Sequence, residues 1–244
     1  MAPPEQTLTL PARRWQIDPR KAGVVAALCW AGFAFIVWLT TTGRSAALDS
    51  AGLLFWRHSD LTPRGPGFLL EAARDVTALG GVLLRNLIAL GAVAALLFLR
   101  LRREAILLGS IVLLGWLLGW SLKMLIGRAR PEIVPHLMHA GGASFPSGHS
   151  FNSAVVYIGI ALAFAAMSQR ASVRLTLITA AIVLSLAVAW SRVWLGVHFP
   201  TDVVAGWLGG AGWAFLAAAL LQPSARRVAE AVKPVGTPPA EARR

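Results

Sequence analysis

Six long apolar runs restrict this chain to a membrane-spanning fold. Each is close to the roughly 20 helical residues that cross the hydrocarbon core of a bilayer, and together they contain one charged residue, Arg85. Helices are expected, because an open chain can satisfy its backbone polar groups inside a bilayer only in that form. We therefore predict an all-α, integral membrane bundle of six transmembrane helices at 22–43, 77–99, 105–122, 150–169, 175–190 and 203–221.

The composition supports that assignment and places all six runs in one domain. Only 14% of the residues are charged, whereas a soluble domain has roughly 25%. We expect a cytoplasmic tail at 1–21, a membrane domain at 22–222, and a basic, disordered cytoplasmic tail at 223–244. Apolar residues recur at helical spacing in 44–74, which predicts short amphipathic helices that lie on the membrane surface or pack against the bundle. Arg85 lies near the start of its run, so we expect its side chain to reach toward the interface.

Positive charges indicate which helix ends face the cytoplasm. Short cytoplasmic loops carry an excess of lysine and arginine, so the net charge of +12 reflects membrane topology and gives no reason to expect a nucleic-acid partner. If both termini lie in the cytoplasm, the connections 44–74, 123–149 and 191–202 face the periplasmic or extracellular side of a bacterial inner (plasma) membrane. With both termini inside, the cytoplasmic segments hold 14 of the 23 lysine and arginine residues: Arg13, Arg14, Arg20, Lys21, Arg100, Arg102, Arg103, Arg170, Arg174, Arg226, Arg227, Lys233, Arg243 and Arg244.

Residues suited to binding an anion gather in these outer connections. Ser147 is a good N-cap, and Gly148 allows close approach to the free N–H groups of a helix start, which form an anion site. Arginine binds phosphate through two parallel hydrogen bonds, and lysine adds a point charge. The pattern predicts a pocket for a tetrahedral dianion. Its members are Lys123, Arg130, Ser147, Gly148, His149, Arg192, His198 and Asp202.

Two histidines supply the chemistry of such a pocket. His198 and Asp202 are four residues apart at the start of the last run. If that turn is helical they share one face, and Asp202 can accept a hydrogen bond from one ring nitrogen of His198. The other nitrogen is then free to attack, and His149 can protonate the leaving oxygen.

The same residues form three motifs. Lys123-x6-Arg130-Pro131, Pro146-Ser147-Gly148-His149 and Ser191-Arg192-x5-His198-x3-Asp202 together resemble the three-part motif of type 2 phosphatidic acid phosphatases. These lipid phosphate phosphatases are related to the glucose-6-phosphatases and vanadium haloperoxidases. The resemblance covers the six-run core, residues 22 to 222, and leaves out the tails.

The resemblance implies a metal-independent reaction without a cofactor, through a phosphohistidine on His198. It also implies that Asp202 orients His198 and that His149 is the acid. The phosphate would be held by the remaining motif residues, which are Lys123, Arg130, Arg192, Ser147 and Gly148.

Three other polar residues of the connection 123–149 fit more than one role. His136 and His139 could form a metal pair, but without a third suitable ligand nearby we predict a lid or surface loop. Arg128 could contact either the substrate phosphate or lipid headgroups, and the sequence leaves both possibilities open.

The leading functional prediction is an extracytoplasmic lipid phosphatase whose partners are the bilayer and a lipid phosphate. Candidate substrates are undecaprenyl diphosphate, phosphatidylglycerol phosphate and phosphatidic acid. Two alternatives remain open: a phosphotransferase that passes the phosphoryl group to another lipid or glycan, and a non-catalytic lipid transporter that needs only the cations. The oligomeric state is not predicted.

Overall fold

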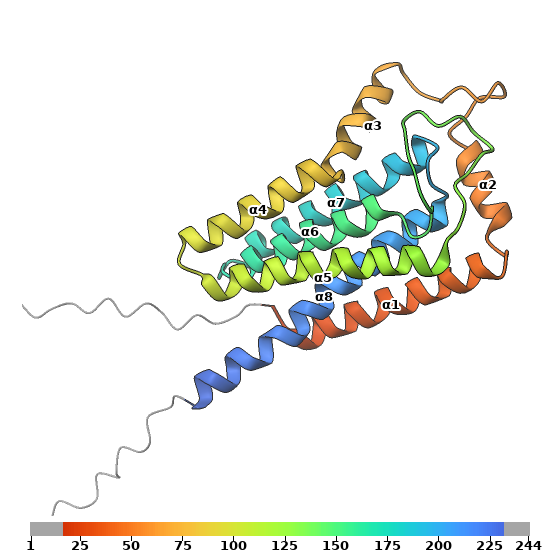
Figure 1. The fold of residues 1–244 in the computed structure, drawn as a ribbon. Helices are drawn as coiled ribbons and strands as arrows, with labels where there is room; N and C mark the ends of the chain where they lie inside the picture. Colours follow the sequence, from red (N-terminus) through yellow and green to blue (C-terminus); the bar gives the residue numbers. More distant parts are fainter. Residues whose placement is uncertain (1–16, 232–244) are drawn as a thin grey trace, which may run out of the picture.

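A computed structural model describes the backbone of residues 17–231 and the side chains of residues 17–220, and its regular elements are all helices (Figure 1). In chain order they are α1 (Pro19–Thr41), α2 (Ala46–Leu54), α3 (Phe68–Leu79), α4 (Val82–Phe98), α5 (Arg102–Ile126), α6 (Gly148–Ala165), α7 (Ala171–Trp194) and α8 (Pro200–Ala231). Among the described residues, five helices are long and apolar enough to cross a membrane, and a sixth span results if the bent pair α3–α4 crosses as one unit. The predicted all-α membrane bundle is thus confirmed.

Helix α6 forms the centre of the bundle. In its most apolar window 67% of the residues are buried inside the protein, against 17% in α5 and in α7. It contacts α5, α7 and α8, while α1 packs along α8. Small residues allow the closest of these approaches. A Cβ atom added to Gly206 would lie 2.6 Å from the Ser147 carbonyl oxygen, and one added to Gly210 would come still closer to the Phe151 carbonyl oxygen.

The contact between α6 and α8 leads to a first prediction. Gly210→Ala should lower the free energy of unfolding in detergent by about 1–3 kcal/mol, because the added methyl group must push two packed backbones apart. Gly91→Ala in α4 is the matched control, since a Cβ atom there would meet no atom within 4 Å. Alanine also favours a helix, so this control should unfold at the wild-type temperature or slightly above it. Equal stability of the two variants would show that α6 and α8 do not pack this closely.

The second predicted span is bent. Helices α3 and α4 meet at 48° across Gly80 and Gly81, and a glycine pair is a common cause of a sharp kink. Arg85, only 5% exposed, donates from Nη1 to the Gly80 carbonyl oxygen at 3.2 Å. The prediction that Arg85 reaches toward the interface is therefore wrong. Its side chain instead satisfies a carbonyl group at the point where the helix is interrupted.

The connections predicted to face outward gather at one end of the bundle, together with α2 and α3 (Figure 1). These two helices are the short helices predicted within 44–74, with α3 continuing to Leu79. Helix α3 packs against the end of α7, where Ala73 joins one apolar cluster with Trp194 and Leu195. Packing against the bundle, one of the two alternatives, therefore applies to α3.

Helices α5, α7 and α8 extend beyond both ends of the apolar runs that predicted them. Helix α8 continues to Ala231, so residues 223–231 are helical where a disordered tail was predicted. Alanine and arginine, which are frequent there, are good helix formers. The predictions for residues 1–16 and 232–244 lie outside the described residues.

Candidate active site

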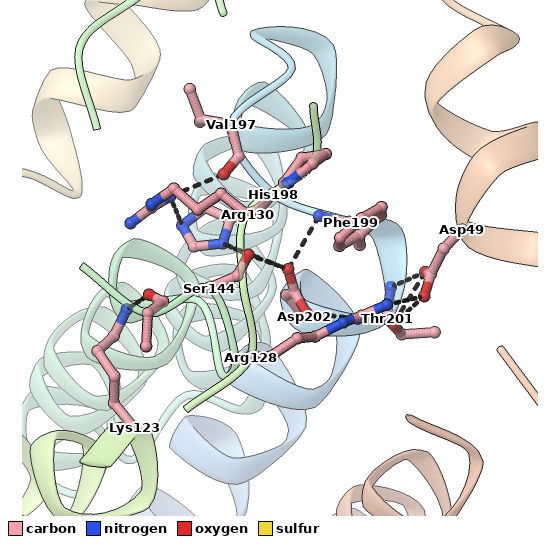
Figure 2. A network of polar contacts seen from close by, with 12 residues as sticks. Asp49, Lys123, Arg128, Arg130, Ser144, Val197, His198, Phe199, Thr201 and Asp202 are labelled. Carbon is pink, nitrogen blue, oxygen red and sulfur yellow. Dashed lines mark hydrogen bonds and ion pairs between the residues drawn. The ribbon is translucent and has the colours of Figure 1, made fainter. Parts of the chain in front are cut away.

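Segments far apart in the sequence bring several of the predicted polar residues together at this end of the bundle, among them Lys123, Arg130, His198 and Asp202 (Figure 2). Lys123 comes from the last turn of α5, and the C-cap residue Gly127, with a positive φ of 61°, follows the helix. Arg130 and Ser144 lie in the connection from α5 to α6. His198 precedes α8, and Asp202 belongs to the first turn of that helix. The clustering predicted from three separate motifs is thus what the fold produces.

His198 is held through a serine rather than directly by Asp202. Its Nδ1 lies 3.6 Å from Asp202 Oδ2, which is too far for a hydrogen bond. The hydroxyl of Ser144 lies between them, with Oγ 3.2 Å from His198 Nδ1 and 2.5 Å from Asp202 Oδ2. The expected direct bond is therefore absent. His198 lies in a loop and not in the helix, so the assumed helical spacing does not apply.

The other ring nitrogen of His198 faces Arg130. Arg130 Nη1 lies 3.1 Å from His198 Nε2, and because a guanidinium only donates, Nε2 must accept. The ring therefore carries its proton on Nδ1. Burial lowers the pKa of His198 to about 4, against an opposing effect of Asp202. At neutral pH the imidazole is thus uncharged, and its lone pair is on the nitrogen that faces Arg130.

The three predicted phosphate-binding cations are held by the surrounding backbone and side chains. Lys123 Nζ donates to the Ala143 carbonyl oxygen at 2.6 Å. Arg130 donates to the carbonyl oxygens of Gly141, Gly142 and Val197 at 2.7 to 3.1 Å. Arg192, only 2% exposed, donates from Nη1 to Thr77 Oγ1 at 2.8 Å, and its Nε is buried without a hydrogen-bond partner among the described residues. These contacts fix the positions of the three cations, of which Arg130 lies directly against the His198 loop.

The turn at Ser147 is built differently from the prediction. Ser147 is the N-cap of α6, as expected, but its backbone N–H donates to the Asp202 carbonyl oxygen at 2.9 Å. That donor is consequently occupied. The Ser147 hydroxyl is buried without a partner in the described part of the chain, and a Cβ atom added to Gly148 would meet nothing within 4 Å. The Ser147 N–H is therefore not a free donor for an anion. The Ser147 hydroxyl and the open space beside Gly148 remain available for one.

His149 is brought to the same site by the first turn of α6. It interacts electrostatically with Arg192 and His198. Its ring also packs on the bend between α3 and α4, where a Cβ atom added to Gly80 would lie 3.2 Å from its Cδ2. The predicted pair of histidines is therefore present at one place.

Arg128 is held by two carboxylates and an aromatic ring of the protein. Its Nη1 donates to Asp202 Oδ1 and its Nη2 to Asp49 Oδ2, both at 2.7 Å, and its guanidinium stacks on the Phe199 ring at 4.1 Å. Asp49 comes from α2 and also accepts hydrogen bonds from the backbone N–H and hydroxyl of Thr201 at 3.0 and 2.8 Å. We call Asp49, Arg128, Thr201 and Asp202 the carboxylate bridge (Figure 2). It ties α2 to the start of α8.

His136 and His139 are exposed residues of the connection between α5 and α6. His136 Nε2 lies 2.7 Å from the Pro131 carbonyl oxygen. Among the side chains described, those of residues 17–220, no group of three or more histidine, cysteine, aspartate or glutamate residues is placed to hold a metal ion. Both histidines therefore belong to a surface loop.

A comparison with protein families identifies the family to which this fold and these motifs belong. The family model described as PAP2 superfamily matches residues 103–226, about half of the chain. This chain belongs to the PAP2 superfamily. The resemblance drawn from the three motifs is thereby confirmed.

Individual PAP2 relatives include enzymes that act on lipid phosphates. Phosphatidylglycerophosphatase B of Bacillus subtilis (strain 168) is 36% identical over 147 residues, which cover 57% of this chain and 68% of the relative. A lipid A 1-phosphatase of Rhizobium etli is 36% identical over 119 residues, or 45% of this chain and 47% of that relative. The chain thus matches about two thirds of the first and about half of the second.

A solved PAP2 structure has the same arrangement of helices. The crystal structure of the transmembrane PAP2-type phosphatidylglycerolphosphate phosphatase from Bacillus subtilis superposes with a TM-score of 0.70 at 27% identity. The alignment covers 86% of this chain and 98% of the other. A membrane lipid phosphatase fold is therefore established for this PAP2 protein.

Residues outside the three PAP2 motifs also contribute to the site. Thr77 and Ser144 each bond to a motif residue, and Asp49 binds Arg128, which in turn bonds to Asp202. Sequence reasoning gave none of the three a role. A signal existed for Asp49, because it is a lone acid in the apolar stretch 46–54. Thr77 and Ser144 are small polar residues with no such signal.

Proposed function

We propose that this PAP2 protein hydrolyses a lipid phosphate on the outer face of the membrane through a phosphohistidine on His198. The observation that carries the proposal is the state of His198: neutral, buried, protonated on Nδ1 and with Nε2 facing the guanidinium of Arg130. The lone pair on Nε2 can attack phosphorus as a nucleophile. The guanidinium of Arg130 beside it can bind the phosphate that is attacked.

The reaction divides into two balanced steps. In the first, the substrate phosphate takes over the donors of Arg130, and the freed lone pair of Nε2 attacks phosphorus. The bond from phosphorus to the lipid oxygen breaks, and His149 gives that oxygen a proton. In the second, His149 removes a proton from water, whose oxygen attacks phosphorus; the bond between phosphorus and His198 Nε2 breaks, which releases inorganic phosphate and restores the neutral imidazole.

Charge stabilisation is assigned to the cations around the ring. Lys123, Arg130 and Arg192 would hold the phosphate oxygens, where charge accumulates in the transition state. The unpaired Nε of Arg192 and the unpaired hydroxyl of Ser147 fit donors to a tetrahedral anion, because buried polar groups normally have partners. Gly148 leaves room for that anion.

Phosphatidylglycerol phosphate is the first substrate to test, because phosphatidylglycerophosphatase B is among the relatives. Phosphatidic acid, undecaprenyl diphosphate and a lipid A phosphate extend the panel. The lipid would enter from the outer leaflet, since the distribution of positive charges favours a site on the side away from the cytoplasm.

The test measures phosphate release by the purified protein in detergent from each of these lipids. We expect release from at least one, unaffected by EDTA because the proposed route needs no metal ion. Label that passes from the substrate to an added lipid or glycan, without free phosphate, would identify a phosphotransferase. No consumption of any lipid phosphate would favour a binding or transport role.

A further inference from the structure

Ser144 is the one described side chain that touches both His198 and Asp202 through a single atom. Its Oγ lies between His198 Nδ1 and Asp202 Oδ2, and the residue is completely buried. Nothing in the three motifs accounts for this hydroxyl, because the second motif begins only at Pro146.

The position of Ser144 is fixed by its backbone. Its N–H donates to the Arg128 carbonyl oxygen at 2.6 Å, and the neighbouring Ala143 carbonyl oxygen accepts from Lys123. On the other side, Phe145 is fully buried in an apolar cluster with Phe33 and Ala205. These contacts hold the Ser144 hydroxyl between the imidazole of His198 and the carboxylate of Asp202.

The direction of the two hydrogen bonds follows from donor counting. A carboxylate only accepts, so the single hydroxyl proton of Ser144 goes to Asp202 Oδ2. Ser144 Oγ can then only accept from His198, which requires a proton on Nδ1. Arg130 independently requires that Nε2 be unprotonated. Two contacts on opposite sides of the ring thus select the same tautomer.

We propose that Ser144 is a positioning residue that links His198 to Asp202 and holds the imidazole with Nε2 free to attack. The inference rests on the proposed phosphohistidine route. As Nε2 bonds to phosphorus, positive charge develops on the ring, and the Nδ1–H bond to Ser144 strengthens. The hydroxyl, polarised by Asp202, passes that stabilisation on without any proton leaving His198.

Ser144→Ala tests this role. We expect kcat to fall about tenfold or more, as for one buried hydrogen bond lost in the transition state, with KM changed less than about twofold. KM should change little because the Ser144 hydroxyl bonds to His198 and Asp202 and is not among the proposed phosphate-binding groups. Rapid-quench measurements should show slower formation of phosphohistidine by the same factor.

The pH profile separates positioning from a merely structural effect. Without the hydroxyl, protonated His198 can bond directly to the carboxylate of Asp202. This bond should raise the pKa of His198 by about 1 unit. The nucleophile must be neutral, so the acidic limb of kcat/KM should move to higher pH by the same amount. A structural defect alone would scale the profile without moving it.

Two further variants complete the experiment. Ser153→Ala is the matched control, since Ser153 is also fully buried but bonds only to the Ser150 carbonyl oxygen of its own helix, and its kinetics should stay at the wild-type level. His198→Ala tests the proposed function itself. If His198→Ala is inactive while Ser144→Ala keeps both the wild-type kcat and the wild-type acidic limb, the positioning role is wrong. If His198→Ala still turns over, the phosphohistidine route fails instead.

Discussion

Replacing His198 by alanine should lower turnover by about four to six orders of magnitude, as loss of a nucleophile does in other enzymes with covalent intermediates. The remaining site can still bind phosphate through its cations, so substrate affinity should change little. The physical reason is that no other described side chain combines a neutral imidazole with a lone pair directed at Arg130. Steady-state phosphate release in detergent measures the loss.

Trapping the intermediate supplies the positive evidence. Rapid quenching of the wild type with radiolabelled substrate should yield protein-bound phosphate that is labile to acid and stable to base, and His198→Ala should yield none. His139→Ala is the matched control, because that histidine is exposed in the connection between α5 and α6, and it should label like the wild type. Label of equal amount on His198→Ala would place the nucleophile elsewhere.

The parts of the fold that follow from sequence are those with a local physical cause. A run such as 150–169 must be helical in a bilayer because its backbone has no other partner. The motifs could be brought together on paper because each lies at a run boundary that the charge bias assigns to the same side. This reasoning requires only the order of the runs, and the structure brings Arg130 against His198 and Ser147 against Asp202, as it predicts.

The features of the fold and the site that could not be predicted from the sequence depend on contacts between distant segments. Asp49 bonds to Arg128 and Thr201, residues 79 and 152 positions away, and no local pattern encodes such a pairing. The direct bond between His198 and Asp202 was expected from a spacing rule that holds only inside a helix. The interruption at Gly80 and Gly81 was visible as a glycine pair, but its consequence for Arg85 required the position of the freed carbonyl group.

The carboxylate bridge leads to the second large effect. Arg128→Met should lower the free energy of unfolding by about 3–5 kcal/mol, since removing the shared cation leaves two buried carboxylates uncompensated. The side chains of Asp49 and Asp202 are 1% and 0% exposed, so water cannot replace the guanidinium. Denaturant titration in mixed micelles measures the change. Turnover should fall as well, because Asp202 Oδ1 loses the contact that orients the carboxylate toward Ser144.

The exposed ion pair between Arg74 and Glu71 provides the comparison. Their side chains are 46% and 69% exposed, and such a pair contributes about 0–1 kcal/mol, so Arg74→Met should be close to the wild type in stability. A double-mutant cycle then isolates the bridge itself. Asp49→Asn should cost less in the Arg128→Met background than in the wild type, because the neutral amide removes one of the unpaired charges. Additive costs would mean that Arg128 and Asp49 do not interact, and the link between α2 and the start of α8 would have to rest on Thr201 alone.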